Sequence, residues 1–194
     1  LGPPGVVRTD GPVLISRRQP RALLYRLATE LRPMPRAQLC YLFWPDVPDA
    51  TARRNLTRLL VLVRSSLPRP TLLVTEDEIV TLDREQVASD TVEFVRLISA
   101  MDSSVRRETL RSAVDLYRGP FLDGFALPDA AEFESWMEEE RRTWERRVLD
   151  TLAALIEVYS AERDYTAAIA FAERYLQHDE LAEDIHRRLI ALYA

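Results

Sequence analysis

The alternation of apolar and polar residues predicts a helix with two different faces between Asp49 and Leu67. At 3.6 residues per turn, six apolar residues fall on one stripe of this helix. They are Ala52, Leu56, Leu59, Leu60, Val63 and Leu67. Arg54, Arg58 and Ser65 fall on the opposite side. Both a solvated outer face and a face that binds a ligand fit this pattern. The segments on either side of the helix are needed to distinguish the two interpretations.

The segments on either side of this helix predict a small mixed domain. Short apolar runs around Asp10-Gly11 predict a hairpin over residues 6–15, because Asp-Gly favours a tight turn. One helix is expected to follow Ser16, and a shorter one to run from Pro35 to Phe43. Apolar runs over residues 72–82 predict a second hairpin. The order hairpin, three helices, hairpin is that of a winged helix, which places its third helix in the major groove of DNA.

The rest of the chain has helical periodicity and no glycine or proline after Pro128. Helices are expected over residues 90–101, 104–117, from Asp129 onward, and 182–194. Residues 152–175 have the spacing of a tetratricopeptide (TPR) helical hairpin. The predicted fold is therefore mostly α with small β: a winged helix-turn-helix in residues 1–86, followed by an all-α, TPR-like bundle in residues 87–194.

Charge is unevenly distributed along the sequence. Residues 1–75 contain 12 Arg and 4 acidic residues, a formal charge of +8, and the remainder has 14 Arg and 27 acidic residues, a charge of -13. The chain contains no Lys. A basic first half suits a polyanionic partner, and an acidic second half does not. The charge pattern therefore favours double-stranded DNA as the ligand of the third helix.

This interpretation assigns roles to nine residues, mostly arginines. Because Arg forms two-pronged hydrogen bonds with guanine, Arg54 and Arg58 are expected at base edges, with Asn55 and Thr57 supporting them. A second set is expected to contact phosphates: Arg17, Arg18, Arg21, Arg53 and Arg64. The acidic tip of the second hairpin, Glu76-Asp77-Glu78, is not expected to touch DNA.

Several other classes of function are disfavoured. The two histidines have no partners at metal-ligand spacing, and no glycine-rich phosphate loop occurs. We expect no metal, no cofactor, no small-molecule ligand and no enzymatic activity. No apolar run reaches the roughly 20 residues that span a bilayer, and the single Cys40 cannot form an internal disulfide. A cytoplasmic location without a membrane partner is expected.

Several stretches resemble one family of bacterial regulators. In the first half they are Leu14 to Leu24 (LISRRQPRALL), Leu42 to Asp46 (LFWPD) and Ala52 to Leu56 (ARRNL); in the second half they are Leu116 to Phe125 (LYRGPFLDGF) and Glu132 to Trp136 (EFESW). These resemble the antibiotic regulatory protein (SARP) family of transcription activators, which join an OmpR/PhoB-type winged helix to a bacterial transcriptional activator domain (BTAD).

The resemblance implies an activator that binds direct repeats near a promoter, as a homodimer or as paired monomers, and recruits RNA polymerase. It also implies that one loop faces polymerase: Pro45, Asp46, Val47, Pro48 and Asp49. The chain is expected to be the N-terminal part of a longer regulator, and some of the first sheet is expected to be missing. The alternative is a protein-interaction module, in which the helical domain docks a partner and the winged helix is a structural adaptor.

Overall fold

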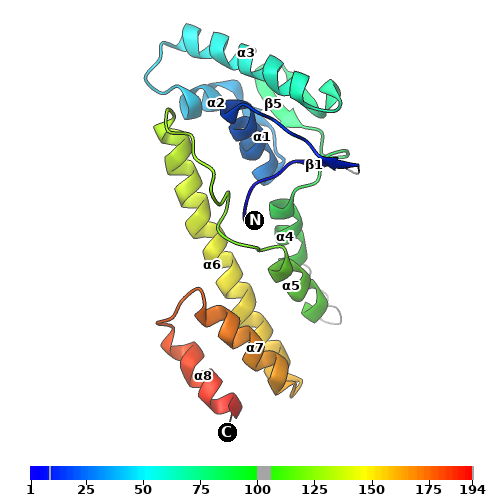
Figure 1. The fold of residues 1–194 in the computed structure, drawn as a ribbon, viewed down its shortest axis with the longest axis vertical. Helices are drawn as coiled ribbons and strands as arrows, with labels where there is room; N and C mark the ends of the chain where they lie inside the picture. The colour runs from blue at the N-terminus through cyan, green and yellow to red at the C-terminus, as the bar shows by residue number, and fades with distance from the viewer. Residues whose placement is uncertain (9, 100–105, 194) are drawn as a thin grey trace. The chain divides into compact units, whose positions relative to one another are not determined.

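The computed structural model describes residues 1–8, 10–99 and 106–193 (Figure 1). It is mostly helical with two small antiparallel sheets. The predicted fold class, a winged helix-turn-helix followed by a TPR-like helical region, is confirmed. In chain order the elements are β1 (Val7–Arg8), β2 (Gly11–Pro12), α1 (Arg18–Glu30), β3 (Met34–Pro35), α2 (Arg36–Phe43), α3 (Asp49–Ser66), η1 (Pro70–Leu72), β4 (Leu73–Glu76), β5 (Ile79–Leu82), α4 (Asp90–Ile98), α5 (Arg106–Asp115), α6 (Ala131–Ala161), α7 (Tyr165–Leu176) and α8 (Glu183–Tyr193).

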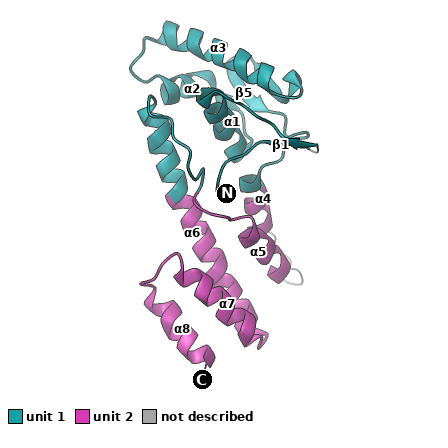
Figure 2. Cartoon of the chain, in the orientation of Figure 1, with its two compact units in different colours: residues 1–92, 121–141 teal, residues 93–120, 142–194 magenta. Residues whose placement is uncertain are grey.

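The chain forms two compact units (Figure 2). Unit 1 comprises Leu1–Val92 and Phe121–Arg141, and unit 2 comprises Glu93–Pro120 and Arg142–Ala194. Unit 1 therefore takes a segment from the second of the two predicted sequence domains. The division of the sequence into residues 1–86 and 87–194 itself stays a prediction.

Unit 1 contains the winged helix. Helices α1, α2 and α3 are followed by the hairpin β4–β5, and β3 pairs with β5 to complete a sheet of order β3-β5-β4. Strand β3 was not predicted, because two residues beside a proline carry no periodic pattern. The first hairpin is shorter than expected, with Val7 opposite Pro12. Residue 9, part of that expected hairpin, lies outside the described residues.

The apolar stripe of α3 packs as predicted. Ala52, Leu56, Leu59, Leu60 and Val63 are all buried, and α3 contacts both α1 and α2. Each buried leucine contributes roughly 1.5–3 kcal/mol. Burial of this stripe turns the polar side of α3 toward solvent.

Residues 121–141 complete the core of unit 1. The ring of Phe125 meets Tyr25 of α1 edge to face at 5.2 Å, and Phe133 of α6 packs on Phe43 of α2 at 5.5 Å. The guanidinium of Arg26, 5% exposed, lies 4.9 Å from the ring centre of Trp136. These aromatic contacts attach the segment to both α1 and α2.

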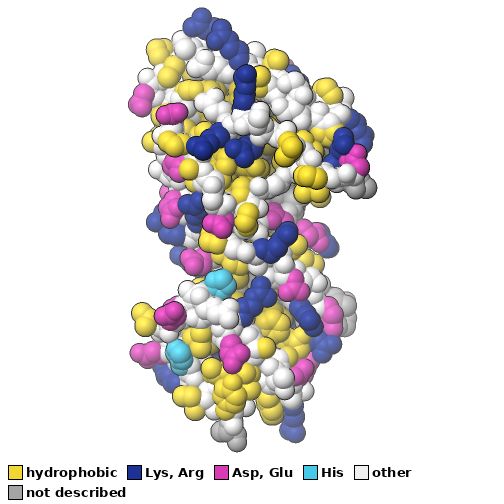
Figure 3. All heavy atoms as spheres, viewed as in Figure 1, with side chains coloured by type: hydrophobic (Ala, Val, Ile, Leu, Met, Phe, Trp, Pro, Cys, Tyr) yellow, Lys and Arg dark blue, Asp and Glu magenta, His cyan; other side chains and the backbone are white. Residues whose placement is uncertain are grey.

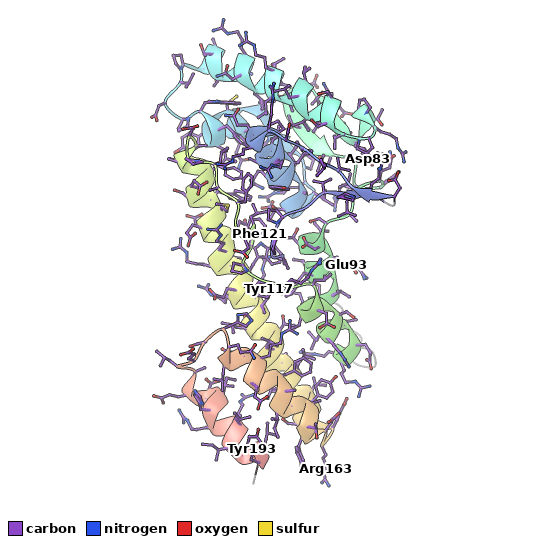
Figure 4. The ribbon with its side chains drawn as sticks, in the orientation of Figure 1. Asp83, Glu93, Tyr117, Phe121, Arg163 and Tyr193 are labelled. Atoms are coloured by element: carbon purple, nitrogen blue, oxygen red, sulfur yellow. The ribbon has the colours of Figure 1, made fainter. Side chains whose placement is uncertain are left out.

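Arg141 holds the loop that precedes α6. Its Nε donates to the carbonyl of Phe121 at 3.0 Å, and its Nη2 donates to the carbonyls of Leu122 at 3.3 Å and Phe125 at 3.4 Å. Figure 4 labels Phe121, the first residue of this loop in unit 1. One guanidinium thus binds three loop carbonyls, of which that of Leu122 also accepts from the backbone nitrogen of Phe125 at 3.0 Å.

Unit 2 is helical. Helices α7 and α8 pack as a pair around Ile156, Ala172, Ala182 and Ile185, and Arg163 lies in the turn between α6 and α7 (Figure 4). Trp144 of α6 meets Phe94 edge to face at 5.7 Å. The expected helices over residues 90–101, 104–117 and 182–194 are found in part, and residues 100, 101, 104, 105 and 194 lie outside the described residues.

The structure joins two of the expected helical segments. The helix after Asp129 and the first helix of the hairpin are one helix, α6, of 31 residues, because no helix breaker separates them. Glu134, in the first turn of α6, accepts a hydrogen bond from the backbone nitrogen of Leu127 in the preceding loop.

Candidate nucleic-acid interface

The outer face of α3 carries a compact set of exposed side chains. Arg54, Thr57, Arg58 and Val61 are exposed and recur at the three- and four-residue spacing that places them on one side of a helix. Arginine side chains project from the outer edge of unit 1 over α3 (Figure 3). Arg54 donates to the hydroxyl of Thr51 at 3.1 Å. Three of the four residues predicted at base edges therefore share one exposed face; the fourth, Asn55, is half-buried at its side.

Arg36, which was not among the predicted residues, belongs to this face. Its Nη2 donates to the hydroxyl of Thr57 at 3.2 Å, and that hydroxyl donates to the carbonyl of Arg53 at 2.9 Å. Arg36 is the first residue of α2, where the helix dipole disfavours a positive charge. No local sequence pattern identifies it, because its partner Thr57 lies 21 residues further along the chain.

The side chain of Arg53 points toward the β4–β5 hairpin, which is the wing of the winged helix. Its Nε donates to Asp49 Oδ2 at 3.0 Å, and its Nη1 donates to Glu78 Oε2 at 2.7 Å. These two hydrogen bonds, the one from Glu78 first, raise the pKa of Arg53 above its usual value. The acidic turn therefore binds an arginine of α3, a contact that the sequence pattern did not predict.

Arg64 also contacts the wing, since its Nη2 donates to the hydroxyl of Thr75 on β4. Arg53 and Arg64 thus connect both ends of α3 to the β4–β5 hairpin. Their predicted contacts with phosphates stay predictions, and in this structure their guanidinium groups hold the hairpin beside α3.

The three arginines near the start of α1 differ in environment. Arg17 and Arg18 are exposed. Arg21 is half-buried, with its guanidinium 5.5 Å from the ring centre of Phe125. Arg18 and Arg21 also line a cavity of about 290 Å³ beside Asp123. Arg17 and Arg18 are therefore accessible to a phosphate, whereas Arg21 packs within the protein.

The loop assigned to polymerase connects α2 to α3. Asp46 and Pro48 are exposed, Pro45 and Val47 are half-buried, and Asp49 is the exposed first residue of α3. Tyr41, on the preceding helix, is 59% exposed. The loop is therefore accessible to a protein, and its assignment stays a prediction.

Within residues 1–8, 10–99 and 106–193, no three His, Cys, Asp or Glu side chains are grouped to hold a metal ion. Cys40 is buried, and burial raises the pKa of its thiol, which disfavours the reactive thiolate. No helix in those same ranges combines the length and apolarity needed to cross a membrane.

Comparison with known proteins identifies the family. Residues 83–194, more than half of the chain, match the model of the bacterial transcriptional activator domain. The chain belongs to the bacterial transcriptional activator domain family. The comparison with curated proteins gave no match.

The fold is shared with a solved structure. Mycobacterium tuberculosis EmbR, in complex with a low-affinity phosphopeptide, matches with a TM-score of 0.75 at 24% identity. The match covers 100% of this chain and 53% of that one, so this chain spans about half the length of its structural relative. Together the two matches confirm the resemblance to SARP-type regulators with a BTAD and support a role in transcription activation.

Proposed function

We propose that this chain is the DNA-binding part of a transcription activator, in which α3 enters the major groove. The observation that carries the proposal is the exposed face of Arg54, Thr57 and Arg58 on the third helix of a winged helix. Arginine at this position of such a fold can bind the O6 and N7 atoms of guanine. Arg17 and Arg18 contact phosphates in the same proposal.

The rest of the proposed activity follows from the family. The chain binds direct repeats near a promoter as paired copies, and the loop from Pro45 to Asp49 faces RNA polymerase. It acts in the cytoplasm through binding, without catalysis or a cofactor. The family match supports the activator role, and the accessibility of the loop supports a protein contact there.

A titration of the whole chain with duplex DNA tests the proposal. We expect the affinity to fall with salt, with a log–log slope of about -3 to -6, because a few arginines displace counterions from phosphates. Arg58→Ala is expected to cost about 1–3 kcal/mol on a selected site and to relax base preference there. Fluorescence anisotropy with a selected duplex and a scrambled duplex measures both effects.

Arg187→Ala is the matched control, since Arg187 is an exposed arginine of unit 2 paired with Glu183. It should leave binding to both duplexes unchanged. If the wild-type chain bound no duplex at low salt, the proposal would be rejected in favour of the structural-adaptor alternative. If Arg58→Ala kept full preference for the selected site, α3 would not read bases through this face.

A further inference from the structure

The β4–β5 hairpin ends in three acidic residues, Glu76-Asp77-Glu78, and Glu78 contacts α3 through Arg53. Glu76 and Ile79 are paired at the end of the hairpin, and Asp77 adopts a left-handed backbone with φ of 47°, which Asp tolerates well. The backbone nitrogen of Arg36 donates to the carbonyl of Glu78 at 2.7 Å. The backbone of Glu78 is therefore held by Arg36 next to the last pair of the hairpin.

Glu78 and Asp49 neutralise Arg53 from two directions. Asp49 lies one turn before Arg53 on α3, and Glu78 reaches it across 25 residues of sequence. The three side chains together carry a formal charge of -1. An isolated exposed ion pair contributes only about 0–1 kcal/mol, but here two carboxylates bind one guanidinium and Asp49 also lies at the favourable end of the helix dipole.

The consequence for DNA binding depends on which contacts carry sequence information. Contacts with phosphates raise affinity for every sequence alike, whereas contacts with base edges distinguish one site from another. Arg53 neighbours the outer face of α3 but points toward the wing. An additional free arginine there would add affinity for all DNA and would lower the ratio of specific to non-specific binding.

We propose that Glu78 is a specificity-determining residue that withholds Arg53 from DNA phosphates and so keeps sequence-independent affinity low. This inference rests on the proposed DNA-binding function. In this proposal the acidic turn affects DNA binding through Arg53, although the turn itself touches no DNA. Arg54 and Arg58 then supply the readout.

The test compares variants of the whole chain that lose the same charge. Glu78→Gln removes the carboxylate that binds Arg53 Nη1 and leaves Arg53 paired with Asp49 alone. Glu76→Gln removes an equal charge from the same end of the hairpin, where no contact with Arg53 is observed among the described residues. Arg53→Gln and the double variant complete a cycle. Binding is measured from 50 to 300 mM KCl with a duplex selected from a random pool by the chain and with a random-sequence duplex of equal length.

We expect Glu78→Gln to bind the random duplex about 3- to 10-fold more tightly than Glu76→Gln at 0.1 M salt, with a salt slope steeper by about 1. The gain on the selected duplex should be smaller. Arg53→Gln alone should change binding less than twofold, and in the Glu78→Gln background it should cancel the gain. Thermal unfolding of each variant checks that the fold is kept.

Two results would overturn the inference while the proposed function stands. One is equal binding by Glu78→Gln and Glu76→Gln, which would reduce the effect to net charge. The other is a severalfold loss in Arg53→Gln alone, which would place Arg53 on a phosphate in the wild type. Absence of binding by every variant at 50 mM KCl would instead reject the proposed function, and this inference with it.

Discussion

At the scale of single residues, the hydroxyl of Thr57 has limited hydrogen-bonding capacity left for DNA. A hydroxyl has one donor and two acceptor positions. In Thr57 the donor is used by the carbonyl of Arg53 and one acceptor by Arg36. One acceptor and the methyl group remain. Thr57 therefore suits the amino group of adenine or cytosine, or the methyl of thymine, and does not suit the acceptors of guanine.

Two substitutions separate these contributions. Thr57→Val keeps the shape and removes the acceptor, and should weaken discrimination at one base pair by about 1 kcal/mol if an amino group is bound. Thr57→Ser keeps the hydroxyl and removes the methyl, and should affect a thymine contact alone. Selection from a random duplex pool measures the base preference of each variant. A preference for guanine at this position that survived Thr57→Val would contradict the assignment.

Local periodicity explains why part of this face could be predicted. The direction of Arg54 and Arg58 follows from the apolar stripe of the same helix, which the sequence contains in full. The direction of Arg53 does not, because it depends on Glu78 of a hairpin that lies 25 residues further on. Arg36 was missed for the same reason, since its partner Thr57 is 21 residues away.

At the scale of elements, the loop before α6 depends on Arg141. Three loop carbonyls accept from its guanidinium, and Phe125 of that loop packs on α1. Arg141→Ala should leave the carbonyls of Phe121 and Phe125 without this donor and lower the free energy of unfolding by about 1–3 kcal/mol. Arg142→Ala, at the exposed neighbouring position, is the control.

Chemical denaturation with urea measures the difference in the free energy of unfolding between Arg141→Ala and Arg142→Ala. DNA binding at a temperature where both variants are folded shows whether loss of the Arg141 contacts also alters α3. Equal midpoints for the two variants would mean that the loop is held by its aromatic contacts alone. In the sequence, Leu116 to Phe125 is one of the stretches that carry the family resemblance. The sequence pattern could not place the loop against α1, because long-range packing has no local periodic signature.

At the scale of the whole molecule, the two folded units do not differ in charge as the two halves of the sequence do. Unit 1 contains 14 Arg and 17 acidic residues, a formal charge of -3, and unit 2 contains 12 Arg and 14 acidic residues, a charge of -2. The basic character of residues 1–75 is offset by the acidic start of α6, which folds into unit 1. Attraction to DNA therefore has to come from local arginines, those on the outer face of α3 together with Arg17 and Arg18, since the net charge of either unit opposes it.

The same folding pattern predicts how a truncated winged helix behaves. Residues 1–82 carry 12 Arg and 7 acidic residues, a charge of +5, so charge alone would favour tighter binding to any DNA. The fragment also loses Phe125 and Phe133, which cover Tyr25 of α1 and Phe43 of α2 in the whole chain. Exposure of these apolar rings removes part of the core and favours aggregation.

We expect the loss of core contacts to dominate, because folding of the winged helix is required before α3 can present its arginines. The fragment should unfold at a lower temperature than the whole chain, bind the dye ANS, and lose the preference for the selected duplex while it keeps weak, salt-sensitive binding to any DNA. Calorimetry, dye fluorescence and anisotropy with the two duplexes measure these properties. A fragment that unfolded cooperatively at the temperature of the whole chain and kept its site preference would show that residues 121–141 are dispensable for the DNA-binding unit.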